Sequence, residues 1–450
     1  MRGAPPEKRG ADGANLTRRR FLLGGATLAA GGIAAGVVVE ETTSSRSGSG
    51  SGSGDRTPPT ASAEPRLPLV ALGGQPSGLP VRQHAWERTL PVDADGNRVA
   101  PRHDRLLFFD VRGTPTERHA RILEAALRTL ERRFSWGPAG LLFTASWGPH
   151  YFTSALGGRS GRAPIPRPRA LSDFELPTID DYDLCLHLAA DDPTRLADVE
   201  GALLHGAHLP GADGPLRLSA ALAWRETRTG FTGAGLPAAH QDTGGIPSGR
   251  PVSGDAPLFM GFKSNLKRNQ ATEDAVTIPS GAFAQGTTMH VSYMRLRLDS
   301  WYGNLSDRER VARMYAPQVS PRQAAAFTTD AKSDPAGYHQ AVSRYGVVGH
   351  AQTSARARRH GKPLILRRDF NTTDHGQAGL HFVALQRTIE DFVTTRNAMN
   401  ASRAQLQNPS ITDTVNNGIN EFIFVLRRGN YIVPARRARA FPQLNGSTAV

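Results

Sequence analysis

The strongest constraint on the fold of this chain is an order of apolar patterns that occurs twice. Strand-like patterns in the first occurrence lie at 105–111, 140–146, 181–189 and 217–224. Helical spacing separates them at 116–134 and 193–205. The second occurrence has strand patterns at 288–298, 363–368, 379–385 and 421–427, and helical patterns at 306–315 and 388–399. This order predicts an α+β fold of two duplicated ferredoxin-like halves with central antiparallel sheets, as in a dimeric α+β barrel.

Composition divides the chain into four regions. Residues 1–39 are a basic segment followed by an uncharged one, and residues 40–67 are a Gly/Ser/Pro linker with almost no apolar content. The remaining patterns predict a first folded half at 68–250 and a second at 251–440.

The N-terminal region is typical of an export signal. Arg18, Arg19 and Arg20 precede Phe21, and a weakly apolar stretch rich in Gly and Ala follows to Val39. The arginine pair resembles a twin-arginine motif, which predicts export by the twin-arginine machinery. No cleavage site follows closely, and the stretch is just long enough to span a bilayer. The protein is therefore expected outside the cytoplasmic membrane, either released to the extracellular or periplasmic space or tethered to its outer face.

Charge and cysteine content exclude several classes of function. The formal net charge is +14, but the arginines are spread along the chain and no basic run alternates with aromatic residues. This pattern predicts no nucleic-acid partner. With Cys185 as the one cysteine, no intrachain disulfide and no Cys-x-x-Cys site exists, and its strand-like surroundings predict a buried, inert thiol.

Five segments, in order, resemble the dye-decolourising (DyP-type) haem peroxidases. They lie at 141–152, 183–192, 259–263, 364–368 and 378–393. The third begins like the Gly-Phe-x-Asp-Gly signature of that family, and the fourth resembles its arginine strand. Together they span about 68–430. The resemblance implies a duplicated ferredoxin-like fold that binds haem b in its second half.

The resemblance also assigns candidate site residues. It implies that His350 is the proximal ligand of the haem iron, and that Arg367, with Arg368 as the alternative, is the distal arginine. Asn371 and Asp369 follow as distal polar partners. Phe262 and Phe382 lie in segments that would contact the haem.

The chain departs from the family at the distal aspartate. Ser264 stands where the signature has that residue, and a serine hydroxyl has no useful pKa for moving a proton between peroxide oxygens. Three nearby residues could substitute for the aspartate by acting through a water: Glu273, Asp274 and His290. Surface placement is the more ordinary expectation for the two acidic residues.

These observations leave three hypotheses. The first is an exported haem b peroxidase that uses hydrogen peroxide and an unidentified reductant. The second is a haem-binding or carrier protein with little turnover, which Ser264 favours. The third is a haem-free binding or structural module with the same fold. The family resemblance also implies a homo-oligomer.

Overall fold

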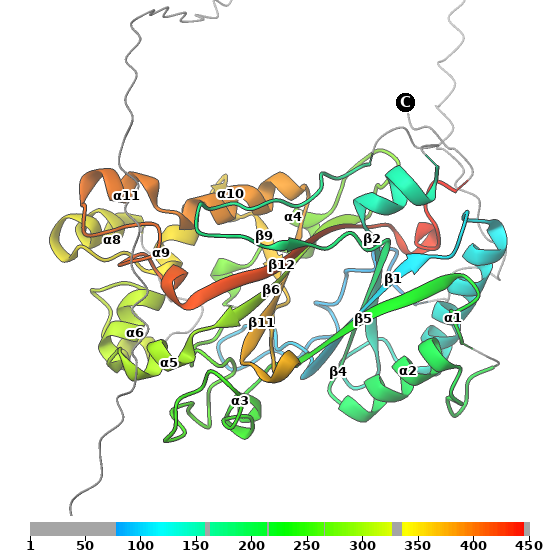
Figure 1. Cartoon of the computed structure of the whole chain (residues 1–450), viewed down its shortest axis with the longest axis horizontal. Helices are drawn as coiled ribbons and strands as arrows, with labels where there is room; N and C mark the ends of the chain where they lie inside the picture. The colour runs from blue at the N-terminus through cyan, green and yellow to red at the C-terminus, as the bar shows by residue number, and fades with distance from the viewer. Residues whose placement is uncertain (1–77, 158–162, 214–215, 265, 326–334, 445–450) are drawn as a thin grey trace, which may run out of the picture. The chain divides into compact units, whose positions relative to one another are not determined.

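The computed structural model describes residues 78–157, 163–213, 216–264, 266–325 and 335–444 (Figure 1). The predicted signal and linker at 1–67 lie outside these residues. Within the described part of the chain, no helix combines the length and the apolar character needed to cross a bilayer.

The first half contains both predicted helices and all four predicted strands. Its elements are β1 (His103–Val111), α1 (Glu117–Arg133), β2 (Leu142–Trp147), β3 (Thr178–Ile179), β4 (Leu184–Ala190), α2 (Pro193–His205), β5 (Leu222–Phe231) and α3 (Leu236–Ala239). Thr116 caps α1 by accepting a hydrogen bond from the His119 amide, and Asp192 caps α2 in the same way. These caps explain why both helices begin where the sequence predicts.

The second half repeats the order with a longer first crossover. A short helix, α4 (Glu273–Val276), precedes the strands, which are β6 (Thr287–Leu296), β9 (Ile365–Arg367), β10 (Phe370–Thr372), β11 (Gly379–Gln386) and β12 (Ile423–Val433). Between β6 and β9 lie α5 (Leu298–Gly303), α6 (Asp307–Met314), α7 (Pro321–Ala325), α8 (Pro335–Gln340), α9 (His350–Ser354) and the two-stranded β7 (Arg358–Arg359) and β8 (Lys362–Pro363). The second crossover holds α10 (Ile389–Met399) and α11 (Ser402–Gln407).

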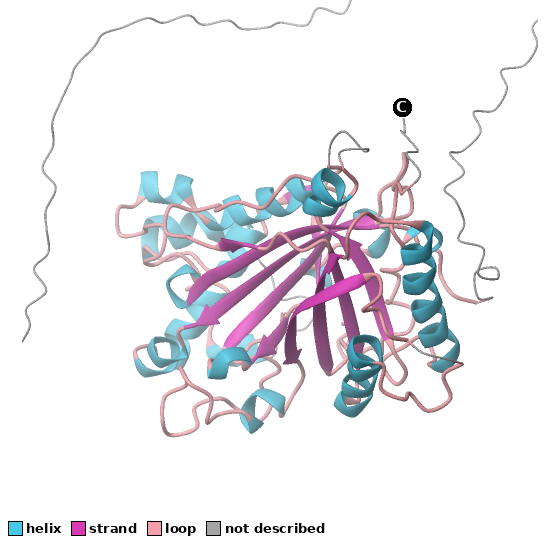
Figure 2. Ribbon diagram, turned by 45° about the vertical axis from the view of Figure 1, so that its right-hand side comes forward, coloured by secondary structure: helices cyan, strands magenta, loops and turns pink. Residues whose placement is uncertain are grey.

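The strands of both halves form one large, mostly antiparallel sheet (Figure 2). The order is β5–β1–β4–β2 in the first half and β12–β6–β11–β9 in the second. Leaving out the short strands β3 and β10, this is in each half the order fourth, first, third, second along the chain. The halves join where Trp147 of β2 pairs with Ile432 of β12, and again where Phe231 of β5 pairs with Asn371 of β10. The parallel pairing of β3 with β12 makes the sheet mixed, and the α+β prediction is confirmed.

Most predicted strands shift by up to three residues at an end, and two strand boundaries differ by more. The first-half strand predicted at 217–224 is β5, which begins at Leu222, because 218–221 forms a turn in which the Leu218 carbonyl accepts from the amides of Ala221 and Leu222. The strand then continues through a polar run that periodicity did not select. Arg228 of this run is buried because Asp180 and Glu226 pair with it. Similarly, β12 continues six residues past the predicted end at 427, to Val433.

Apolar side chains pack on both faces of the sheet. One cluster brings strands of both halves together, with Phe108, Val291 and Tyr431 among its buried members. Cys185 belongs to this cluster, and burial raises the pKa of its thiol, so the predicted buried thiol is confirmed. A second, larger cluster packs α1 and α2 onto the outer face of the first half.

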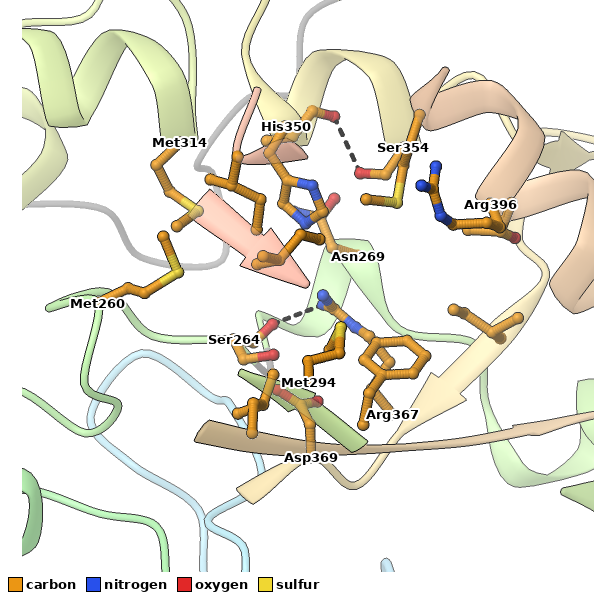
Figure 3. Close-up of a pocket in the computed structure, with 18 of the residues that line it drawn as sticks. Met260, Ser264, Asn269, Met294, Met314, His350, Ser354, Arg367, Asp369 and Arg396 are labelled. Atoms are coloured by element: carbon orange, nitrogen blue, oxygen red, sulfur yellow. Dashed lines mark hydrogen bonds between the residues drawn. The ribbon is translucent and has the colours of Figure 1, made fainter. Parts of the chain in front are cut away.

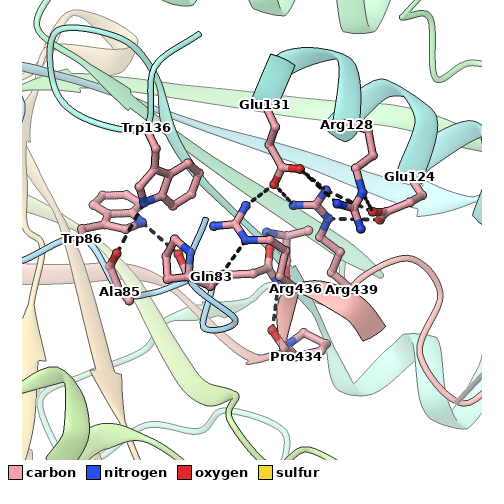
Figure 4. Close-up of polar contacts among 12 residues, drawn as sticks. Gln83, Ala85, Trp86, Glu124, Arg128, Glu131, Trp136, Pro434, Arg436 and Arg439 are labelled. Carbon is pink, nitrogen blue, oxygen red and sulfur yellow. Dashed lines mark hydrogen bonds and ion pairs between the residues drawn. The ribbon is translucent and has the colours of Figure 1, made fainter. Parts of the chain in front are cut away.

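A buried charge network fixes the C-terminal segment beneath α1 (Figure 4). Arg436 and Arg439 both pair with Glu131, and Arg439 and Arg128 both pair with Glu124. Although burial opposes ionisation, the arginines hold the pKa of Glu131 below its ordinary value. Every carboxylate of this network thus has at least two guanidinium partners.

Candidate functional site

A large cavity lies in the second half, between the outer face of the sheet and the helices α6, α9 and α10. Its empty space, which includes solvent open to the outside, is about 1480 Å³. The wall is mostly apolar, and four of the six methionines in the chain line it, namely Met260, Met294, Met314 and Met399. Eight residues were predicted at the site, counting Asp369 and Ser264. Seven of them line this cavity, and Arg368 is the exception.

His350 enters the cavity from the first residue of α9 (Figure 3). The backbone just before this helix lies close to Tyr315. A Cβ atom at Gly349 would lie 2.0 Å from the Tyr315 carbonyl oxygen, so the close approach requires a glycine there. Nδ1 of His350 is buried, and neither ring nitrogen hydrogen-bonds to a described residue. Burial, reinforced by Arg367 and Arg396, lowers the pKa of His350 to about 3. The imidazole is therefore neutral at ordinary pH and keeps a lone pair free for a ligand.

Arg367 lies on the opposite wall, at the end of β9 (Figure 3). Its Nη2 donates to the backbone carbonyl of Ser264 over 2.6 Å, and Nε donates to Gln270 over 3.4 Å. Arg367 forms no ion pair with a described residue, and burial lowers its pKa. This wall therefore presents a guanidinium whose positive charge is not neutralised by direct pairing.

Ser264 and Asp369 lie beside Arg367 on the same wall (Figure 3). Ser264 contacts the arginine through its carbonyl, so its hydroxyl takes no part in holding the guanidinium. Asp369 makes no hydrogen bond or ion pair within the described part of the chain. Its negative charge acts on Arg367, raising the pKa of the guanidinium against the larger effect of burial.

Asn371 lines the cavity, but its side-chain amide already hydrogen-bonds to backbone groups. Its side-chain oxygen accepts from the amide of Phe259 over 2.8 Å, and its nitrogen donates to the carbonyls of Phe231 and Pro257. It thus ties β10 to β5 and to the loop that forms the cavity wall. This role differs from that of the distal polar partner that the sequence suggested.

The two predicted phenylalanines form aromatic parts of the wall. Phe262 contacts Tyr315 edge to face at 5.4 Å between ring centroids, and Phe382 lies 6.1 Å from Phe392. Arg368 points to the opposite face of the sheet. It donates to the carbonyl of His84 and stacks over the Trp86 ring at 3.8 Å. Strand alternation separates it from Arg367, so the alternative assignment to Arg368 is not supported.

The three candidate substitutes for the missing aspartate do not line the cavity. Glu273 is buried, contrary to the surface placement expected, because it pairs with Arg368 and accepts from the amide of Trp86. Asp274 is exposed and pairs with Arg82. His290 lies beneath Phe392, stacked at 3.6 Å, and hydrogen-bonds to Asn430 and Ser292.

Sequence reasoning missed two features of the cavity. The first is the set of four methionines, which no spacing rule brings together. The second is a buried pair, Arg396 and Arg428, which line the cavity and share Glu175 at 2.6 and 2.7 Å. Two guanidinium groups on one carboxylate leave a net positive charge at this end. An anionic group on a ligand would be stabilised there.

The solved structures that resemble this fold include DyP-type peroxidases. DyPB from Rhodococcus jostii RHA1 has a TM-score of 0.51 and 13% identity, over 80% of this chain and 98% of its own. A variant of the same protein in complex with heme has a TM-score of 0.50 and 14% identity, over 80% and 99%. At these identities the similarity shows the fold: this chain has a DyP-like mixed α+β fold.

The chain also matches a protein-family model. The model covers residues 101–435 and is described as a family of unknown function, DUF7405, and the chain belongs to that family. No curated protein matches the chain.

Proposed function

We propose that the second-half cavity binds haem b, with His350 as the ligand to the iron. The observation that carries this proposal is a neutral imidazole without a hydrogen-bond partner, which faces a large apolar cavity opposite a guanidinium. A histidine nitrogen and an apolar, methionine-rich wall suit an iron porphyrin. Its propionates suit the positive charge of Arg396 and Arg428. The heme complex of a protein with the same fold supports the assignment.

We propose further that the protein is a peroxide-dependent oxidoreductase. Haem b, when bound, supplies the redox chemistry with hydrogen peroxide. Arg367 would orient the peroxide and stabilise the negative charge that develops as its O–O bond breaks. The apolar wall would exclude water, which strengthens that interaction. The reductant is unidentified.

A second candidate is a haem-binding or carrier protein with little peroxide turnover. The specific observation in its favour is Ser264, which replaces an acid–base residue with a hydroxyl. Under both candidates the same strand order in both halves supports a duplicated ferredoxin-like unit. Export by the twin-arginine route, location outside the cytoplasmic membrane and self-association remain parts of the proposal.

The test is a hemin titration of the full-length protein followed by visible spectroscopy. We expect a Soret band that saturates at a single haem per chain and shifts in His350→Ala. His205→Ala, an exposed histidine at the end of α2, is the matched control and should leave the band unchanged. Absence of stoichiometric haem would overturn the proposed function.

A further inference from the structure

The cavity retains one acidic side chain although the distal aspartate of the related proteins is a serine here. Among the described residues that line it, Asp369 is the sole carboxylate. The nearby polar side chains already have partners. Asn371, on the same wall, and Gln270, behind it, hydrogen-bond to backbone groups. Glu273, which does not line the cavity, pairs with Arg368 on the other face of the sheet.

Asp369 also has the position that a proton-transfer group needs. It follows Arg367 by two residues, between β9 and β10, so both side chains project from the same wall. Figure 3 places it beside Ser264 and Arg367, across the cavity from His350. No described residue donates to its carboxylate. Asp369 is partly buried, lines the cavity and has no partner among the described residues, so its carboxylate is free to accept a proton from a ligand.

We infer that Asp369 is the catalytic base of this cavity and takes over the role that Ser264 cannot fill; the inference rests on the proposed haem function. Asp369 would accept one proton of hydrogen peroxide and return it to the oxygen that leaves as water. Arg367 would stabilise the negative charge that develops on that oxygen as the O–O bond breaks. Haem b, when bound, would supply the two electrons that reduce the peroxide.

Cyanide binding to the ferric haem-loaded, full-length protein tests this inference without turnover. Hydrogen cyanide must lose a proton to a base in the cavity before it binds as an anion. Asp369→Asn should slow cyanide association by about 100-fold, within the usual range for loss of a general base. The Soret band should persist, because His350 is unchanged.

Three further variants sharpen the test. Asp369→Glu should restore most of the rate, since a carboxylate is retained. Ser264→Asp in the Asp369→Asn background should also restore it, because the second carboxylate enters from the neighbouring loop. Asp255→Asn, at an exposed loop position, is the control and should bind cyanide at the native rate.

The outcomes separate this inference from the proposed function. A bound haem with slow cyanide association in Asp369→Asn, rescued by either carboxylate, supports the inference. A bound haem with an unchanged rate in Asp369→Asn overturns the inference and leaves haem binding intact. Failure of the native chain to bind haem overturns both.

Discussion

The two halves of the sheet have the same strand order, yet their outer faces are covered in different ways. In the first half, α1 follows β1 after five residues and packs directly on the sheet with α2, so the face is filled by apolar side chains such as Leu127 and Phe143. In the second half, the corresponding crossover is drawn out into α5 to α9. Helices α6 and α9 of this crossover line the cavity that His350 enters.

The difference extends to charge. The buried charges of the first half are paired several times over, as in the network of Glu124 and Glu131 with their arginines. In the second half, Arg367 has no ion-pair partner among described residues, and His350 has no hydrogen-bond partner for its ring. One strand order therefore supports either a filled core or a cavity, depending on the segment that follows its first strand. We interpret the filled half as structural and the hollow half as functional.

The largest effect is expected for the charge network beneath α1. Glu131→Ala leaves Arg436 and Arg439 buried without a carboxylate between them, and should lower the free energy of unfolding by about 3–5 kcal/mol. Urea unfolding measures this loss in the free energy of unfolding. Glu117→Ala removes an exposed pair with Arg121 and should cost less than about 1 kcal/mol. Similar losses in the two variants would mean that the network does not hold the C-terminal segment.

Truncation of one side chain in each half compares the two packings. Leu127→Ala removes a fully buried leucine from α1 and should cost about 2–5 kcal/mol. Met294→Ala should cost less than half as much, because this side chain already borders a cavity and loses fewer contacts. Urea unfolding of both haem-free variants under the same conditions gives the ratio. Equal losses would show that the second-half wall is packed as tightly as the first.

The pH dependence of stability tests the state of His350. Its folded pKa is about 3, below the ordinary value of 6.5, because of burial and of Arg367 and Arg396. The unfolded chain takes up this proton below about pH 6.5 and the folded chain does not, so stability is complete above that pH and falls towards pH 3. Between about pH 7 and about pH 5 the loss is about 2 kcal/mol.

His350→Gln removes the titrating group and should flatten this part of the profile in urea unfolding of the haem-free chain. His205→Gln, at an exposed position of the first half, should keep the native slope. An unchanged slope in His350→Gln would contradict a buried, neutral imidazole.

The smallest effects concern the helix caps. Thr116→Ala and Ser306→Ala each remove an N-cap, with an expected cost of about 1 kcal/mol. Because α1 belongs to the filled core, loss of its cap should appear as a global loss in urea unfolding. Loss of the α6 cap should instead appear as faster amide exchange within α6 alone. A global loss from Ser306→Ala would mean that the long crossover is as integral to the core as α1.

Much of the fold follows from periodicity. The predicted helix at 193–205 coincides with α2, because its first-turn proline, its Asp192 cap and Gly206 beyond its end all agree. Periodicity failed at β5, where charged side chains are buried by pairing with residues distant in sequence. It also gave no account of α5 and α7 to α9, whose few residues per helix carry no amphipathic repeat.

Less of the site could be predicted, because its contacts also join residues that lie far apart in the sequence. The family resemblance predicted that His350, Arg367, Phe262 and Phe382 share one site, and all four line the cavity. Their roles remain predictions. The resemblance did not reveal that Asn371 is occupied by backbone contacts, since these depend on the junction of β10 with β5. Nor did it identify the methionines or the pairing of Arg396 with Glu175, which lie 221 residues apart.

The central claim is that the second-half cavity alone takes the haem, and mass spectrometry under non-denaturing conditions tests it most directly. After incubation with hemin, the native full-length chain should carry one haem. Met294→Trp, which fills the cavity from β6, should carry none while its circular dichroism spectrum stays native. Haem retained at full stoichiometry by the folded Met294→Trp chain would contradict the account, because the ligand would then lie elsewhere.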